Sequence, residues 1–357
     1  MSRAYYEYKG AIHIHSTYSD GSGEVNEIVE AARNAGLDFI ILTDHNTLKA
    51  KELGWEGWRN GLLVLVGDEI TQRGGHCLAL GLDAHVWHLQ HHRMIIDEIK
   101  VKGGLSFIAH PDGVWRPFFR RHNHRWEDWS FNSFTGLEIW SYMFDWASKF
   151  RFYEMWKFWQ HPDDSISGPN PALLKHWDRL CRESPVVGIG GVDVHARGLD
   201  PYGKVVVFPY TDLFCTIRTH ILLTAPFSGH FSTDADAVLG ALRAGRCFIG
   251  YDLLADTTGF RFHLVDAQAM MGDTILWTPN LTAEVCAPRS GIVTILRDGV
   301  PLREIRGTGE TFPLDTPGVY RAEVRLHERP WIYSNPIYVR ADVSVTTPDF
   351  PYREAPP

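Results

Sequence analysis

Residues 10–22 read GAIHIHSTYSDGS and combine an apolar, strand-like run with two histidines and an aspartate. We predict a buried first strand over 10–15, in which successive side chains alternate between the two faces. His13 and His15 are two positions apart, so their imidazoles are expected on one face. Asp20 follows five residues later in a polar turn. Two imidazoles and a nearby carboxylate are ligand types that metal ions such as zinc use in proteins.

The sequence that follows alternates helix-like and strand-like segments up to about residue 250. The segment 24–35 places Val25, Ile28 and Val29 at helical spacing, and Gly36 follows it as a stop signal. Repeated strand–helix units of this kind predict an α/β region with a parallel sheet or barrel. Short apolar runs, typical of strands buried on both faces, recur at 38–42, 62–66, 77–81, 105–109, 136–140 and 186–189.

Metal-binding residue types recur at or beside the ends of these predicted strands. The carboxyl ends of parallel barrel strands meet on one face, where such folds build their active sites. One histidine alone would more often be an ordinary structural residue, so the argument depends on the repetition. Asp44 and Asp68 adjoin candidates and are expected to orient an imidazole or cap a helix. The nine candidate metal ligands are His13, His15, Asp20, His45, Glu69, His76, His110, Asp193 and His195.

The chain is long enough for two domains with separate cores, because it has 357 residues and 44% of them are apolar. We place an α/β barrel at 1–253, an antiparallel β-sandwich at 254–345 and a tail at 346–357. An insertion at about 114–176 is rich in tryptophan and forms either a local core or a lid over the site. The sandwich is predicted from strands at 260–265, 281–286, 292–297, 319–326 and 337–343, with a hairpin turn at Asp298-Gly299.

Charge and motif content disfavour several classes of protein. Lys and Arg number 35 against 43 Asp and Glu, a net charge of −8, which argues against stable binding to nucleic acid or to an anionic membrane. The chain shows no apolar leader, no uninterrupted apolar run of about 18 residues and only scattered cysteines, so we expect a cytoplasmic protein. It also lacks a GxSxG elbow, a P-loop and a dinucleotide fingerprint.

The candidate ligands occur in motifs that resemble those of a known family. The motifs are His13-x-His15 with Asp20, Thr43-Asp44-His45, Glu69, His76, Ala109-His110-Pro111 and Asp193-x-His195. Together and in this order they resemble the four motifs of the PHP family, named for polymerase and histidinol phosphatase domains, over roughly the first 250 residues. The C-terminal region, with Met271-Gly272-Asp273 and the segment 329–336, is similar to the CehA/McbA branch of PHP metallohydrolases, which includes carbaryl hydrolases.

The resemblance implies a distorted (β/α)7 barrel with a trinuclear metal centre. It assigns the first ion to His13, His15, Glu69 and Asp193. The second ion would be held by His76 and His110, with Glu69 as the bridge, and the third by Asp20, His45 and His195. Nitrogen and oxygen ligands without sulfur suit two to three divalent ions of zinc, manganese or iron and do not choose among them.

We expect a metal-dependent hydrolase in which a metal-bridging hydroxide attacks a small phosphate ester. A phosphate is favoured because three divalent ions would outweigh the charge of the three ligand carboxylates. Arg197 is predicted as a catalytic clamp on the substrate, with Arg73 and Arg116 as further candidates. One alternative is a carbamate, ester or amide hydrolase of the CehA/McbA type. Another is a catalytically silent PHP scaffold whose sandwich binds a partner.

Overall fold

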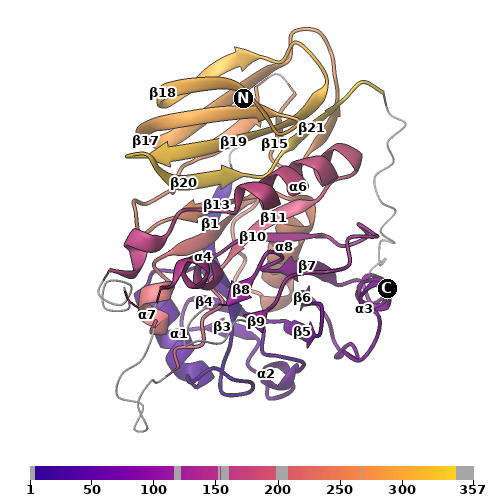
Figure 1. Cartoon of the computed structure of the whole chain (residues 1–357), viewed down its shortest axis with the longest axis vertical. Coiled ribbons are helices and arrows are strands. Elements are labelled where there is room, and N and C mark those ends of the chain that lie inside the picture. The colour runs from indigo at the N-terminus through magenta and orange to yellow at the C-terminus, as the bar shows by residue number, and fades with distance from the viewer. Residues whose placement is uncertain are drawn as a thin grey trace.

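The computed structural model of the chain describes residues 5–115, 122–151, 153, 161–197, 208–265 and 267–342. These residues form a mixed α/β region followed by a largely antiparallel β region, which lies above it in Figure 1. None of the helices in the described ranges has the length and apolar character needed to cross a membrane. The five cysteines are all free thiols.

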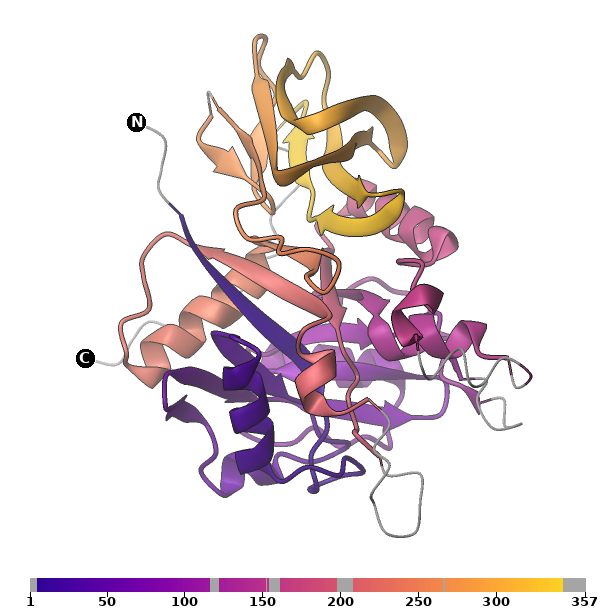
Figure 2. The same ribbon diagram turned by 90° about the vertical axis from the view of Figure 1, so that its left-hand side faces the viewer.

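The first sheet of the α/β region has a parallel centre flanked by antiparallel strands. Its strands here are β1 (Tyr6–Ile14), β2 (Phe39–Leu42), β3 (Gly57–Arg59), β4 (Leu62–Val66), β12 (Ile217–Leu223) and β13 (Cys247–Tyr251). β1, β2 and β4 run parallel, as the sequence predicts, whereas β12 and β13 join the other side of β1 as antiparallel strands. Figure 2 shows β1 crossing the α/β region beside these added strands.

The second sheet is mixed rather than parallel. Its strands are β5 (Asp68–Gln72), β6 (Gly75–Leu80), β7 (Leu105–Ala109), β10 (Gly136–Ser141) and β11 (Val187–Gly191). β7, β10 and β11 run parallel, but β5, β6 and β7 pair antiparallel. The expectation of parallel strands was wrong here because Arg73 and Gly74 form a tight hairpin turn, with φ of +93° at Gly74. Glu69 and His76 therefore lie within strands of this hairpin and not at the ends of parallel strands.

Helices pack against strands of both sheets, and one part of the core is shared by the two sheets. They are α1 (Val25–Asn34), α2 (Lys49–Glu52), α3 (His92–Val101), α4 (Tyr142–Lys149), the 3-10 helix η3 (Pro162–Ser165), α6 (Pro171–Glu183), α7 (Tyr210–Leu213) and α8 (Phe231–Ala244). Val238 and Leu242 of α8 pack in one buried cluster with Ile12 and Ile189, which belong to different sheets. Isolated bridges also join Ile14 to Val194 and His45 to Glu69. The closed (β/α)7 barrel stays a prediction.

The C-terminal strands continue the first sheet and do not stand apart from it. They are β14 (Arg261–Leu264), β15 (Ala269–Met270), β16 (Thr274–Leu276), β17 (Thr282–Arg297), β18 (Val300–Pro313), β19 (Gly318–Leu326), β20 (Arg329–Ser334) and β21 (Ile337–Arg340). β13 pairs antiparallel with β20, so the two regions share a 14-stranded sheet. The Asp298-Gly299 turn is confirmed, with φ of +54° and +80°. The domain limits at 253 and 345 stay predictions, and the tail lies outside the described residues.

A buried ion pair also links the two regions. Arg321 of β19 reaches Asp178 of α6 through two hydrogen bonds of 2.6 and 2.8 Å, and its guanidinium lies over the ring of Trp177. In the tryptophan-rich insertion, the small strands β8 (Val114–Trp115) and β9 (His122–Asn123) pair, and Trp126 and Trp146 are buried. The insertion thus supplies local core. A lid stays a prediction, because 116–121, 152 and 154–160 lie outside the described residues.

Candidate metal centre

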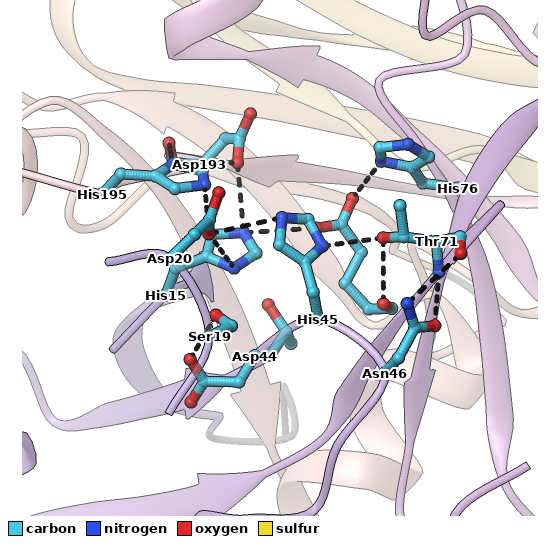
Figure 3. Close-up of polar contacts among 12 residues, drawn as sticks. His15, Ser19, Asp20, Asp44, His45, Asn46, Thr71, His76, Asp193 and His195 are labelled. Carbon is cyan, nitrogen blue, oxygen red and sulfur yellow. Dashed lines mark hydrogen bonds and ion pairs between the residues drawn. The ribbon is translucent and has the colours of Figure 1, made fainter. Parts of the chain in front are cut away.

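The structure brings all nine predicted ligands together, from positions spread over almost two hundred residues. They cluster where β1, β2, β7 and β11 end and where β5 and β6 pass beside them. Figure 3 shows six of them, namely His15, Asp20, His45, His76, Asp193 and His195. The side chains form three groups of potential metal ligands, within each of which the ligand atoms lie within 4.8 Å of one another. The groups are His13, His15, Glu69 and Asp193; Glu69, His76 and His110; and His15, Asp20, His45 and His195.

The first group forms the buried floor of the cluster. The Nε2 atoms of His13 and His15 each lie 3.2 Å from Oε2 of Glu69. The same two nitrogens lie 3.3 and 3.2 Å from Oδ1 of Asp193. Both imidazoles and the Glu69 carboxylate are fully buried. Four donor atoms thus face one small volume from three separate segments.

Glu69 also belongs to the second group through its other oxygen. Its Oε1 lies 2.8 Å from Nδ1 of His76 and 3.2 Å from Nε2 of His110. Because each of its two oxygens faces a different group, this carboxylate has the geometry of a bridge between two ion positions.

The third group is the open end of the cluster. Oδ1 of Asp20 lies 3.4 Å from Nε2 of His45 and 3.1 Å from Nε2 of His195. The side chains of Asp20, His45 and His195 are 38%, 23% and 21% exposed, in contrast to the buried floor. His15 joins this group as well, so it is shared in the same way as Glu69. A molecule from solvent therefore reaches the cluster over the third group.

Unusual backbone at the ligands explains how the cluster converges. His13, His110 and Asp193 have positive φ values of 70°, 28° and 51°, which are rare for residues other than glycine. The pairing of β1 with β2 also shifts register between Ile12 and Ile14. His13 of β1 and His15, directly after the strand, do face the same carboxylates, but through this bulge rather than through simple strand alternation. Such outliers are typical of functional sites, where the surrounding structure maintains the strain.

The residues fit a cluster of metal ions. Five buried polar atoms at its centre have no hydrogen-bond partner: Nε2 of His13, both ring nitrogens of His15, Oε2 of Glu69 and Nδ1 of His110. Buried polar atoms without partners are costly, and metal coordination is one way of satisfying them. The donor set contains only nitrogen and oxygen, which suits zinc, manganese or iron.

The charges of the floor also favour cations. Burial alone would lower the pKa of His15, but Asp193 and Glu69 outweigh it and raise that pKa to about 9. Burial alone would raise the pKa of Glu69, yet the surrounding histidines, His13 first, hold it well below its usual range. The ionised carboxylates therefore favour positive charge on the buried floor, which protonated imidazoles supply when no metal ion is bound. Divalent ions would supply it.

Hydrogen bonds at the open end orient two of the imidazoles. The Thr71 hydroxyl donates to the carbonyl oxygen of Glu69 and lies 2.7 Å from Nδ1 of His45, so it accepts the proton of that nitrogen. Nδ1 of His195 lies 3.0 Å from the carbonyl oxygen of Asp193, which can only accept. Both rings therefore carry their proton on Nδ1 and leave the Nε2 lone pair for a metal ion. Thr71 is not among the residues predicted from the sequence, because its role depends on the β5–β6 hairpin.

The two aspartates that adjoin ligands act on loops rather than on ligand rings. Asp44 accepts hydrogen bonds from the backbone N–H of Ser16 and the hydroxyl of Ser19, and so holds the turn that carries Asp20. Asp68 lies beside Nδ1 of His85 and accepts from the backbone N–H of Thr47.

The arginine candidates differ in their surroundings. Arg197 donates from Nε to the carbonyl oxygen of Asp20 over 3.1 Å and pairs through Nη2 with Oδ2 of the same residue. It thus holds the carboxylate whose other oxygen faces His45 and His195, while a role as a substrate clamp stays a prediction. Arg73 is exposed in the β5–β6 turn, and Arg116 lies outside the described residues.

The structure adds His124 to the surroundings of the cluster. Its Nδ1 lies 3.5 Å from Nε2 of His76, and its ring packs edge-on against the ring of Phe144. Burial, together with the nearby His76 and His110, lowers the pKa of His124 to about 4, so it is neutral near pH 7. Nothing in its spacing distinguished it from the other histidines of the chain.

The sequence of the chain is similar to those of known proteins over the segment that carries most of this site. The family model of the PHP domain matches residues 11–112, which include seven of the nine cluster residues. The chain belongs to the PHP family. An uncharacterized protein of Methanocaldococcus jannaschii is 30% identical over 118 residues, which cover 29% of this chain and 67% of that protein. The phosphoribosyl 1,2-cyclic phosphate 1,2-diphosphodiesterase of Eggerthella lenta is 35% identical over 82 residues, which cover 20% of this chain and 30% of the enzyme.

Among solved structures, a two-domain protein from Bacteroides vulgatus that contains a predicted PHP-like metal-dependent phosphoesterase aligns with 93% of this chain and 95% of its own. The sequence identity is 15% and the TM-score is 0.39.

Proposed function

We propose that this PHP protein is a metal-dependent phosphoesterase that hydrolyses a small phosphate ester at a cluster of two to three divalent ions. The observation that supports the proposal most is the sharing of Glu69 and His15 among three adjacent ligand groups. Shared ligands place neighbouring ions close enough to act on one substrate. When bound, such ions supply Lewis acidity, lower the pKa of a water molecule and neutralise phosphate oxygens.

The charge of the cluster favours a phosphorylated substrate over a neutral one. The three groups contain three carboxylates and six histidines. Three divalent ions carry twice as much positive charge as the three carboxylates carry negative charge. A cluster with all three ions bound would therefore attract an anion. A phosphate monoester dianion gains more from this surplus than a neutral carbamate or amide does. The net charge of −8 on the whole chain favours a small phosphorylated molecule over nucleic acid.

The open end of the cluster suggests how the chain binds that phosphate. Glu69 and Thr71 of β5 both face the cluster, and strand alternation continues their face to Arg73 in the turn. In the described part of the chain, Arg73 has no hydrogen-bond or ion-pair partner. An exposed arginine two positions beyond Thr71, which contacts His45 of the third group, suits a phosphate that extends outward from that group. The proposal therefore assigns substrate binding to Arg73 and positioning of Asp20 to Arg197.

Hydrolysis assays with purified protein test the proposal directly. The protein is loaded with zinc, manganese or iron and given p-nitrophenyl phosphate beside a 1-naphthyl carbamate. The expected result is turnover of the phosphate ester, abolished by a chelator and restored by metal. Turnover of the carbamate but not of the phosphate ester would show that the protein is a carbamate hydrolase and not a phosphoesterase. No turnover of either compound by metal-loaded protein would favour a silent scaffold.

A matched pair of variants tests the role of Arg73. Arg73→Met should raise KM for the phosphate ester about 10–100-fold without changing the metal content, since a charged hydrogen bond to substrate is lost. Arg306→Met removes an exposed arginine from β18 in the C-terminal region and should change neither quantity. Equal KM values for the two variants would exclude Arg73 from substrate binding.

A further inference from the structure

One buried carboxylate touches the cluster without belonging to any of the three ligand groups. Glu138 lies in β10 and is 1% exposed. Its Oε1 is 2.9 Å from Nδ1 of His13, and its Oε2 accepts a 2.7 Å hydrogen bond from the backbone N–H of His110. In the described part of the chain, no lysine or arginine pairs with it. Glu138 thus joins the side chain of one predicted ligand to the main chain of another.

We propose that Glu138 is a positioning residue that sets the metal affinity of the His13 and His110 groups. This inference rests on the metal binding proposed above. An ionised carboxylate only accepts hydrogen bonds, so Nδ1 of His13 must donate to it. The proton of the neutral ring is then on Nδ1, and the Nε2 lone pair faces Glu69 and Asp193. The other tautomer would direct an N–H group at the ion position.

The second hydrogen bond acts on backbone geometry. His13 and His110 have φ values of +70° and +28°, and both conformations are unfavourable for residues other than glycine. Glu138 contacts both residues and connects two strained segments through one side chain. Without Glu138, the two strained backbone segments could relax and the ring of His13 could adopt its other tautomer. Both changes would remove nitrogen lone pairs from the ion positions.

The neighbouring strand leaves space for this carboxylate. Gly191 of β11 pairs with Ser141, but the carboxylate of Glu138 reaches it: a Cβ atom at position 191 would lie 2.9 Å from Cδ of Glu138 and would overlap its Oε1. The same Cβ atom would lie 3.1 Å from Cβ of His13. The φ of Gly191 is not positive, so the backbone does not require glycine here. Glycine is needed because a side chain at position 191 would occupy the space that the Glu138 carboxylate fills.

The test is metal binding by Glu138→Gln, measured by manganese or zinc titration and by metal content after dialysis. Glutamine keeps the size of the side chain but has one acceptor oxygen, so it can serve only one of the two donors. We expect metal affinity at the floor to fall about 10–100-fold, as for other groups that orient metal ligands. Asp252→Asn is the matched control, because the side chain of Asp252 is a carboxylate that is only 3% exposed, pairs with His220 and contacts none of the nine residues. Its metal affinity should equal that of the wild type.

The outcomes distinguish a failure of the inference from a failure of the proposed function. Metal binding by E138Q equal to that of the wild type would overturn the inference while leaving the proposed function intact. Equal losses in E138Q and D252N would also overturn it, because the effect would then be general destabilisation. A wild-type protein that binds no metal would overturn the proposed function itself. If E138Q does not fold, Gly191→Ala displaces the same carboxylate, and unchanged metal binding by a folded G191A would overturn the inference.

Discussion

Replacing Gly191 by alanine would disturb the metal site through a single added methyl group. The new Cβ would lie 2.9 Å from Cδ of Glu138, whereas ordinary van der Waals contacts begin near 3.4 Å. The carboxylate must move, and its hydrogen bonds to His13 and His110 are only 2.9 and 2.7 Å long. We expect overpacking to cost about 1–3 kcal/mol of stability. We also expect metal affinity to fall about 10–100-fold, or about 1.4–2.7 kcal/mol for each affected ion.

Gly188→Ala is the matched control because it adds the same methyl group to the same strand. Its Cβ would lie 2.8 Å from the ring of Trp177 and 3.1 Å from Ile139, away from the ligand groups. Both variants should lower Tm by about 1–4 °C at this chain length. Only Gly191→Ala should weaken zinc or manganese binding in a calorimetric titration. The reasoning is refuted if both variants bind metal equally well, or if both lose metal in proportion to their stability.

Three further predictions follow from other contacts. Glu69→Gln removes the shared carboxylate, so kcat/KM should fall at least about 10²–10³-fold with a lower metal content, and wild-type activity in this variant would contradict the bridge. Asp178→Asn leaves Arg321 buried without its main partner and should cost about 3–5 kcal/mol in urea unfolding, while a loss below about 1 kcal/mol would show that the pair does not join the two regions. Burial alone would lower the pKa of His220, but Asp252 and Glu7 outweigh it and raise that pKa, so its stabilisation is complete below about pH 6.5 and is lost as pH rises through the folded value. His220→Gln should therefore be more destabilising at pH 6 than at pH 9 in urea unfolding, and an equal effect at both would contradict the raised pKa.

The convergence of the nine candidate residues could be predicted from the sequence because their chemistry coincides with local pattern. His110 directly follows an apolar run, His45 comes three residues after another, and His13 and His15 share a strand end, so strand prediction alone places them near one edge. Glu69 and His76 were also predicted as site residues, although the predicted parallel direction of their strands was wrong. Their hairpin carries both side chains to the same place that parallel strand ends would have reached.

The remaining features depend on contacts between distant segments. Glu138 lies inside an apolar run at 136–140, and its role depends on how β10 lies against β7 and β11. β12 and β13 carry polar residues, including Arg218, Thr219 and His220, that are buried only because partners such as Asp252 and Thr257 come from elsewhere. The continuation of the first sheet into the C-terminal strands depends on the pairing of β13 with β20, which no local pattern indicates.

Anomalous X-ray scattering from crystals grown with manganese or zinc would test most directly whether the cluster holds metal ions. We predict two or three anomalous peaks, each among one of the three ligand groups, with one peak on each side of the Glu69 carboxylate. A metal-loaded crystal with no peak beside Glu69, or with peaks only at other surface histidines, would contradict it.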